Sequence, residues 1–249
     1  MSKITLEVIA TSPDDCCAIE AGGGDRIELC SALELGGLTP SLGLLIEARR
    51  RTRLPIMAMV RPRAGGFCYD EGEFAAMLVD AELLLGHGAD GLVFGCLHAS
   101  GMVDVARTAA LVRLAGDRQA VFHRAFDVTP DPFAALDVLA GLGVTRVLSS
   151  GQSPSALEGA ANLRAYRAHA GDRLQILPGG GINLANVEDV LRLIGADQVH
   201  ASLSGVAVDS STAANPSLRF GLASPPPEDR VRVTDGASVA AMRKLIGGE

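Results

Sequence analysis

The chain has 249 residues, of which 48% are hydrophobic, and it carries a formal net charge of −7. Seven phenylalanines, two tyrosines and no tryptophan leave no basic or aromatic platform for nucleic acid, which excludes that class of partner. No stretch approaches the roughly 20 apolar residues of a membrane span. We therefore expect a single cytoplasmic domain over residues 1–249 with no membrane partner, and the five cysteines lack the CxxC spacing of a zinc ribbon.

Short apolar runs recur about every 20 to 35 residues, with helical stretches between them, a spacing typical of βα units. The predicted strands are residues 4–9, 26–30, 56–60, 91–95, 120–124, 146–150, 174–177 and 198–201. Eight such units predict an α/β protein, a single (β/α)8 TIM barrel whose reactive groups gather at the C-terminal ends of the strands.

The later helices have recognisable ends. Pro132 opens a predicted helix at 131–142, and Asn183 is expected to cap a helix that runs to Ile194. Residues 202–233 form a long irregular segment, a candidate lid or oligomer contact. Residues 235–246 are predicted as the last helix. We expect a homo-oligomer, with a dimer favoured.

Alternation along each predicted strand separates side chains that point into the barrel from those that face the helices. In the second strand, Ile27 and Leu29 face the helices, so Glu28 and Cys30 share the interior side. The same argument places further side chains in the interior: Glu7 and Ile9, Met57, Met59 and Arg61, and His200 and Ser202. Burial of an unpaired charge costs free energy, so the charged groups among them must form ion pairs or line a solvent-filled functional site at the end of the barrel.

Two interpretations of this polar interior stay open. In the first, the carboxylates neutralise Arg26, Arg61 or Arg124 in a structural layer, and the histidines are plain hydrogen-bonded residues. In the second, they form an active site. The candidate catalytic residues are then Glu7, Glu28, His123, Asp127 and His200. The candidate ligand-binding residues are Arg61, Arg63, Arg124, Ser150, Gly179, Gly180, Gly181 and Ser202. A cationic rim on an acidic protein attracts anions, so we expect a small anionic ligand.

Gly179, Gly180 and Gly181 follow the seventh predicted strand and precede a predicted helix. Many barrels bind phosphate at this position through backbone N–H groups. A tight turn without a ligand is the alternative, because glycine is also suited to close packing. No nucleotide cofactor is indicated.

Several motifs together resemble the CutC family of copper homeostasis proteins. They are Arg26-Ile27-Glu28-Leu29-Cys30, Gly36-Gly37-Leu38-Thr39-Pro40-Ser41, Arg61-Pro62-Arg63, Phe122-His123-Arg124-Ala125-Phe126-Asp127, Arg146-Val147-Leu148 and Pro178-Gly179-Gly180-Gly181-Ile182. The resemblance implies a cytosolic TIM barrel that self-associates, binds copper and acts in copper handling. Cys30 is the candidate metal ligand that it implies. The family's other copper-binding cysteine position holds Ile9 here, and Ala64 begins the Ala-Gly-Gly that replaces the family's Gly-Gly-Asp.

Three functions are therefore weighed. The resemblance favours copper homeostasis, with possible copper binding at Cys30. The residues favour an enzyme, an isomerase, lyase or hydrolase, acting on a small phosphorylated or carboxylated metabolite. An interaction scaffold that uses residues 202–233 is the third.

Overall fold

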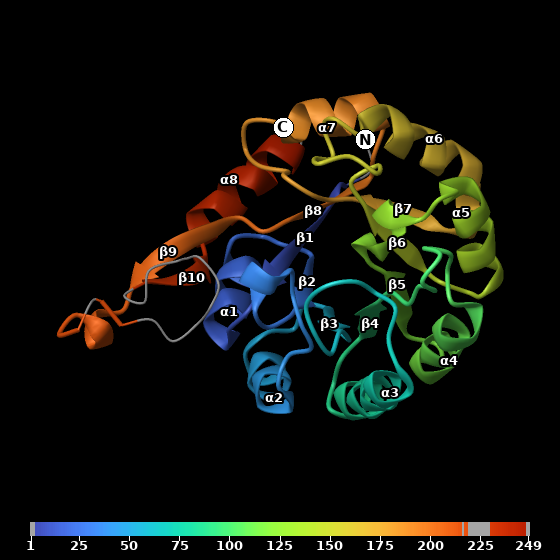
Figure 1. Ribbon diagram of the computed structural model, residues 1–249. Helices are drawn as coiled ribbons and strands as arrows, with labels where there is room; N and C mark the ends of the chain where they lie inside the picture. The colour runs from blue at the N-terminus through green and yellow to red at the C-terminus, as the bar shows by residue number, and fades with distance from the viewer. Residues whose placement is uncertain (1–2, 216, 219–229, 248–249) are drawn as a thin grey trace.

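The computed structural model describes residues 3–215, 217–218 and 230–247, and it forms a (β/α)8 barrel with the helices outside the strands (Figure 1). The eight barrel strands are β1 (Thr5–Ala10), β2 (Arg26–Leu29), β3 (Ile56–Met59), β4 (Gly91–Phe94), β5 (Gln119–Phe122), β6 (Arg146–Ser149), β7 (Gln175–Pro178) and β8 (Gln198–Ala201). All neighbouring pairs are parallel, β1 pairs with β8, and a bridge between Gly179 and His200 joins β7 to β8. The predicted fold class is confirmed.

Within the described residues, eight α-helices alternate with these strands or follow them: α1 (Pro13–Ala21), α2 (Leu42–Arg51), α3 (Glu71–Gly86), α4 (Val105–Ala115), α5 (Pro132–Gly141), α6 (Ala160–Ala170), α7 (Val187–Ile194) and α8 (Gly236–Gly247). Pro132 opens α5 as predicted, and the Asp131 side chain caps the helix. The predicted start of α7 is wrong, because Asn186 and not Asn183 precedes it. The side chain of Asn186 accepts from the Asn183 amide, which holds residues 183–186 in a turn before the helix.

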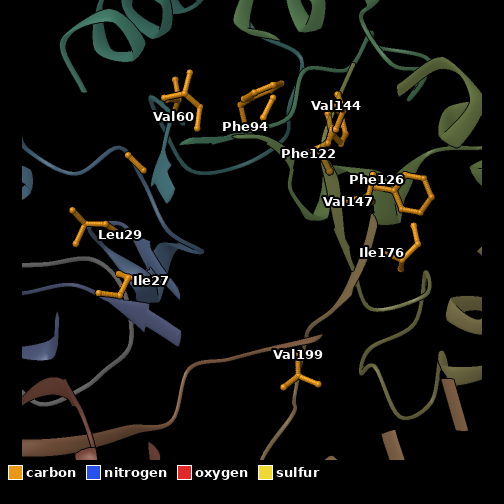
Figure 2. Packing of buried hydrophobic residues seen from close by; sticks show 14 of the residues in the cluster. Ile27, Leu29, Val60, Phe94, Phe122, Phe126, Val144, Val147, Ile176 and Val199 are labelled. Carbon is orange, nitrogen blue, oxygen red and sulfur yellow. The ribbon is translucent and has the colours of Figure 1, made fainter. Parts of the chain in front are cut away.

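Alternation along the strands divides the core into two clusters. Ile27 and Leu29 belong to the large cluster between strands and helices, part of which Figure 2 shows. Inside the barrel, Cys30 packs in a smaller cluster with Met57, Met59, Val93 and Val121. Ile9 packs against this inner cluster. The interior positions predicted for Ile9, Cys30, Met57 and Met59 therefore agree with the structure.

The N-terminal end of the barrel interior is polar and internally paired. Arg26 forms an ion pair with Glu7 and donates to Oε1 of Gln198 at 2.9 Å. Arg146 donates to the side chains of Gln119 at 2.6 Å and Gln175 at 3.1 Å. This layer fixes the carboxylate of Glu7, which Arg26 holds from the N-terminal side of the interior.

The segment before the last helix was predicted to be irregular. This prediction is wrong at both ends of the segment, where the structure has strands. β9 (Ser204–Val208) and β10 (Arg230–Thr234) pair antiparallel and project from the barrel beside α1 (Figure 1). The alternating valines of both strands explain this structure, because period-2 patterns suit a strand. Residues 216 and 219–229 of that segment lie outside the described residues. Among the described helices, none combines the length and the hydropathy needed to cross a bilayer.

Candidate active site

A cavity of about 260 Å³ opens at the C-terminal ends of the strands, where barrel enzymes hold their active sites. Its wall includes eight of the residues predicted from the sequence: Glu28, Arg61, His123, Arg124, Gly180, Gly181, His200 and Ser202. Each follows or ends a barrel strand, so the topology itself brings them together. The cavity thus combines carboxylate, imidazole, guanidinium and hydroxyl groups in one space.

His200 lies between two carboxylates at the cavity floor. Its Nδ1 atom is 2.8 Å from Oε1 of Glu7, and its Nε2 atom is 3.8 Å from Oε2 of Glu28. Glu7 lies behind His200, does not line the cavity and is held by Arg26. The sequence therefore produces a row of four groups, Arg26, Glu7, His200 and Glu28, that ends at the cavity. All four are more than 90% buried.

The charges of this row shift its pKa values. Burial opposes ionisation of Glu7, but Arg26 and His200 outweigh it and hold the Glu7 pKa well below its usual range. Burial also opposes the charged form of His200, yet Glu28 and Glu7 raise the His200 pKa. Burial raises the pKa of Glu28 to about 7, against the attraction of His200. Glu28 therefore titrates near neutral pH beside an imidazole whose charged form is favoured, a combination suited to general acid–base chemistry.

The same three side chains bring potential metal-ligand atoms of Glu7, Glu28 and His200 within 4.8 Å of one another. Both oxygens of Glu7 are already engaged, one by Arg26 and one by His200. A cation here would have to displace one of these two partners. The group is therefore better described as an ion-pair network than as a metal cage.

His123 follows β5 and lines the cavity while remaining 5% exposed. Its Nδ1 atom accepts a hydrogen bond of 3.1 Å from the amide of Ala125. The ring of Phe67 lies 4.9 Å from it, centroid to centroid. Burial and the nearby Arg61 lower the pKa of His123 to about 3, so the ring is neutral at physiological pH.

Arg61 holds the loops that form one wall of the cavity. Its Nη1 atom donates to the carbonyls of Leu35, Gly36 and Gly37 at 3.1 to 3.2 Å, and its Nη2 atom donates to Gly65 at 2.8 Å. Only Nε of this guanidinium lacks a partner among the described residues. Arg61, predicted to bind an anion, thus uses most of its N–H donors in hydrogen bonds to loop carbonyls.

Arg124 is more available to a ligand. Its Nε donates to Asp127 at 2.8 Å and its Nη2 to the hydroxyl of Ser150 at 2.7 Å, while 44% of its side chain is exposed. A Cβ added to Gly180 would come within 3.5 Å of the Arg124 guanidinium. Gly180 and Gly181 both have positive φ, 103° and 71°, which only glycine adopts readily. The turn therefore presents its backbone beside a cation, as an anion site requires.

The remaining predicted site residues lie outside the cavity wall. Asp127 accepts from Ser149, from Ser150 and from the amide of Gln152, so it orders the loop after β6. Arg63 pairs with Glu73 on α3. Gly179 packs against Leu148, where an added Cβ would come within 2.5 Å of a side-chain methyl.

Cys30 is 1% exposed within the inner apolar cluster. Burial, and then the charge of Glu28, raise the pKa of its thiol above the ordinary value. The thiol is therefore protonated at neutral pH.

Alternation along the strands predicted two apolar residues of the wall, Ile9 and Met59, but sequence reasoning did not identify the rest. Leu33, Gly36 and Gly37 from the loop after β2, Phe67 from the loop after β3, Leu148 and Ile182 complete it. The consecutive glycines 36 and 37, both with positive φ, were the available signal, because they fold the loop over the barrel mouth. The wall thus combines apolar side chains with the guanidinium groups of Arg61 and Arg124.

Comparison with known proteins places these features in one family. The CutC family model matches residues 4–205. A CutC protein of Treponema denticola is 48% identical over 99% of both chains, and the human copper homeostasis protein cutC homolog is 38% identical over 96% of this chain and 88% of its own. A solved structure of CutC from Streptococcus agalactiae matches with a TM-score of 0.75 at 31% identity, covering 79% of this chain and 97% of its own.

Proposed function

The chain belongs to the CutC family, a copper homeostasis family by the names of its relatives, and we propose that it is an acid–base enzyme acting on a small anionic metabolite. One observation carries this proposal: His200 lies between Glu7 and Glu28, at 2.8 and 3.8 Å, on the floor of an open cavity. A histidine oriented by a buried carboxylate and facing a second titrating group is the usual arrangement of a proton-transfer site.

The charge of the cavity supports an anionic substrate. Arg124 and the turn at Gly180 and Gly181 form one side, and within the described chain no hydrogen-bond partner is found for the amides of these two glycines. A phosphate or carboxylate would receive hydrogen bonds from both amides and a charge from Arg124. Phe67 and Leu33, which also line the cavity, would contact the carbon part of the ligand.

The experiment is a thermal-shift screen of the purified protein against phosphorylated and carboxylated metabolites, followed by calorimetric titration of those that stabilise it. Arg124→Ala should weaken binding at least tenfold, since it removes a charge-assisted contact. Arg192→Ala is the matched control, because Arg192 is an exposed arginine on α7 that pairs with Asp189. The proposal fails if no anion binds, or if Arg124→Ala binds as the unmodified protein does.

Copper binding at Cys30 is the second proposal, and the inner cluster supports it. Met57 and Met59 pack in the same cluster as Cys30, and Cu(I) prefers such sulfur ligands. Cys30 would have to release its proton on binding, against the burial that raises its pKa. Ile9, at the position of the second family cysteine, contributes no donor. Bound copper would supply a soft Lewis-acidic centre beside the cavity.

Anaerobic Cu(I) titration against a competing chelator tests this second proposal. Cys30→Ser should lose the site, whereas Cys17→Ser, an exposed cysteine on α1, should keep it. Equal affinity in Cys30→Ser would remove Cys30 as the ligand.

We further propose a cytoplasmic homo-oligomer, with a dimer favoured. Val206, Val208 and Val231 on β9 and β10 are 59%, 72% and 47% exposed, which supports an intermolecular contact there. Sedimentation of the protein and of Val208→Asp would test the oligomer, and cell fractionation would test the location.

A further inference from the structure

Three residues that line the same cavity each have a buried polar atom without a partner in the described part of the chain. These atoms are Oε1 of Glu28, Nε of Arg61 and Nε2 of His123. Buried polar groups are paired in native proteins, with protein, water or a ligand. A ligand that reached these atoms would therefore meet one acceptor and two donors.

The role of His123 follows from its hydrogen bond. The amide of Ala125 can only donate, so Nδ1 of His123, which receives that bond, carries no proton. The neutral ring must then carry its proton on Nε2, on the other side of the imidazole. Protonation of Nδ1 would break the bond to Ala125 and place a second positive charge near Arg61. His123 is thus a fixed N–H donor, and it does not shuttle protons.

The packing around His123 holds this orientation. Phe67 covers the ring on one side, and Gly95 at the end of β4 lies so close that an added Cβ would come within 2.5 Å of Nδ1. The absence of a side chain at Gly95 therefore creates the space that the ring occupies. Such a donor is already oriented before any ligand arrives.

A neutral N–H donor and a carboxylate facing one cavity complement a carbonyl compound that loses a proton next to its carbonyl group. We propose that His123 donates its Nε2–H to the carbonyl oxygen of an anionic carbonyl substrate, while Glu28 removes a proton from the neighbouring carbon. This inference rests on the proposed function of the same cavity, and it adds the substrate class and the reaction step.

The step balances without a cofactor. The C–H bond breaks and its proton passes to the Glu28 carboxylate. Its electron pair forms the new C=C bond, and the carbonyl π electrons move to the oxygen. The resulting enolate oxygen accepts a hydrogen bond from Nε2 of His123. Return of the proton to the same carbon completes an exchange. In an α-hydroxy carbonyl substrate, transfer of the hydroxyl proton to the enolate oxygen and return of the first proton to the former carbonyl carbon complete an isomerisation.

The first test is spectroscopic. In protein labelled with ¹⁵N-histidine, His123, assigned by its loss in His123→Gln, should show a proton on Nε2 from pH 5 to 8 with no titration. Addition of 2-phosphoglycolate, a stable mimic of an anionic enolate, should shift this resonance. A titrating ring, a proton on Nδ1, or no shift with bound phosphoglycolate would overturn the inference.

The second test measures deuterium uptake from D2O into dihydroxyacetone phosphate, glyceraldehyde 3-phosphate, pyruvate and oxaloacetate. On the probe that exchanges, His123→Ala should lower the maximal rate about 100-fold with little change in KM. His123→Gln, which keeps an N–H donor, should recover part of this loss. His98→Gln, a control in an exposed loop, should exchange like the unmodified protein.

The outcomes separate the two proposals. Anion binding that depends on Arg124, without deuterium uptake into any probe, would overturn this inference and leave the proposed function standing. An exchange rate that is unchanged in His123→Ala would overturn this inference as well, because the Nε2–H group would then take no part in the reaction. The absence of both anion binding and deuterium exchange would overturn both proposals.

Discussion

The Nδ1 atom of His200 lies 2.8 Å from Oε1 of Glu7, on adjacent strands whose register places these two residues side by side. This contact adds a side-chain interaction between β8 and β1, the pair of strands that closes the barrel. It also connects the polar layer at the N-terminal end of the interior to the cavity at the other end. Structural and functional interpretations of Glu7 are therefore compatible, since its pairing with Arg26 is what fixes His200.

Removal of the Glu7 charge should destabilise the barrel. In Glu7→Gln, Arg26 would remain buried without its counter-charge, which costs about 3 to 5 kcal/mol. Urea unfolding measures this free energy. Glu47→Gln, in an exposed pair with Arg50, should change stability by less than about 0.5 kcal/mol. A similar small change in Glu7→Gln would show that Arg26 finds other partners.

Glu28 should give the protein an inverse dependence of stability on pH. Its pKa is raised from 4.5 to about 7 in the folded state. Between these values the folded chain binds a proton that the unfolded chain does not, so stability falls as pH rises through this window. The loss amounts to about 3 kcal/mol. Unfolding titrations from pH 4.5 to 8 should show it in the unmodified protein and not in Glu28→Gln; parallel curves would contradict it.

Gly95→Ala should disturb the site without altering any polar group. The new methyl would lie 2.4 Å from Cε1 of His123 and 2.7 Å from Cβ of Ala125, so the ring must move. We expect a stability loss of about 1 to 3 kcal/mol and loss of the Nε2–H signal described above. Gly86→Ala is the control, because its Cβ would meet open space at the end of α3. There, alanine should be neutral or stabilising by up to about 1 kcal/mol.

The limits of sequence-based inference follow from which interactions are local. Alternation is a local property of a strand, so the interior positions of Glu28, Cys30 and His200 could be predicted from the sequence. The eight units and their order were predictable for the same reason. Asn183 was a plausible cap by composition, and only the turn formed with Asn186 moves the start of α7.

The hydrogen-bond partners of the polar side chains in the site could not be predicted in the same way. Arg61 was expected to bind an anion, but its partners are carbonyls of two loops whose conformations depend on positive φ at Gly36, Gly37 and Gly65. The tautomer of His123 likewise depends on the amide two residues later. Such assignments need the path of the backbone, which residue types alone do not provide.

Substitutions of Arg61 and of Arg124 should therefore affect stability and anion affinity differently. Arg61→Met leaves four loop carbonyls without their cation, and hydrogen bonds to charged groups contribute about 1.5 to 3 kcal/mol each before compensation by water. We expect a loss of about 3 kcal/mol in urea unfolding and faster amide exchange in residues 33–37. Arg124→Met removes a half-exposed cation and should change stability by less than about 1 kcal/mol, while anion affinity falls at least tenfold. If Arg61→Met keeps its stability and loses only affinity, the guanidinium binds the ligand directly and the loops have other support.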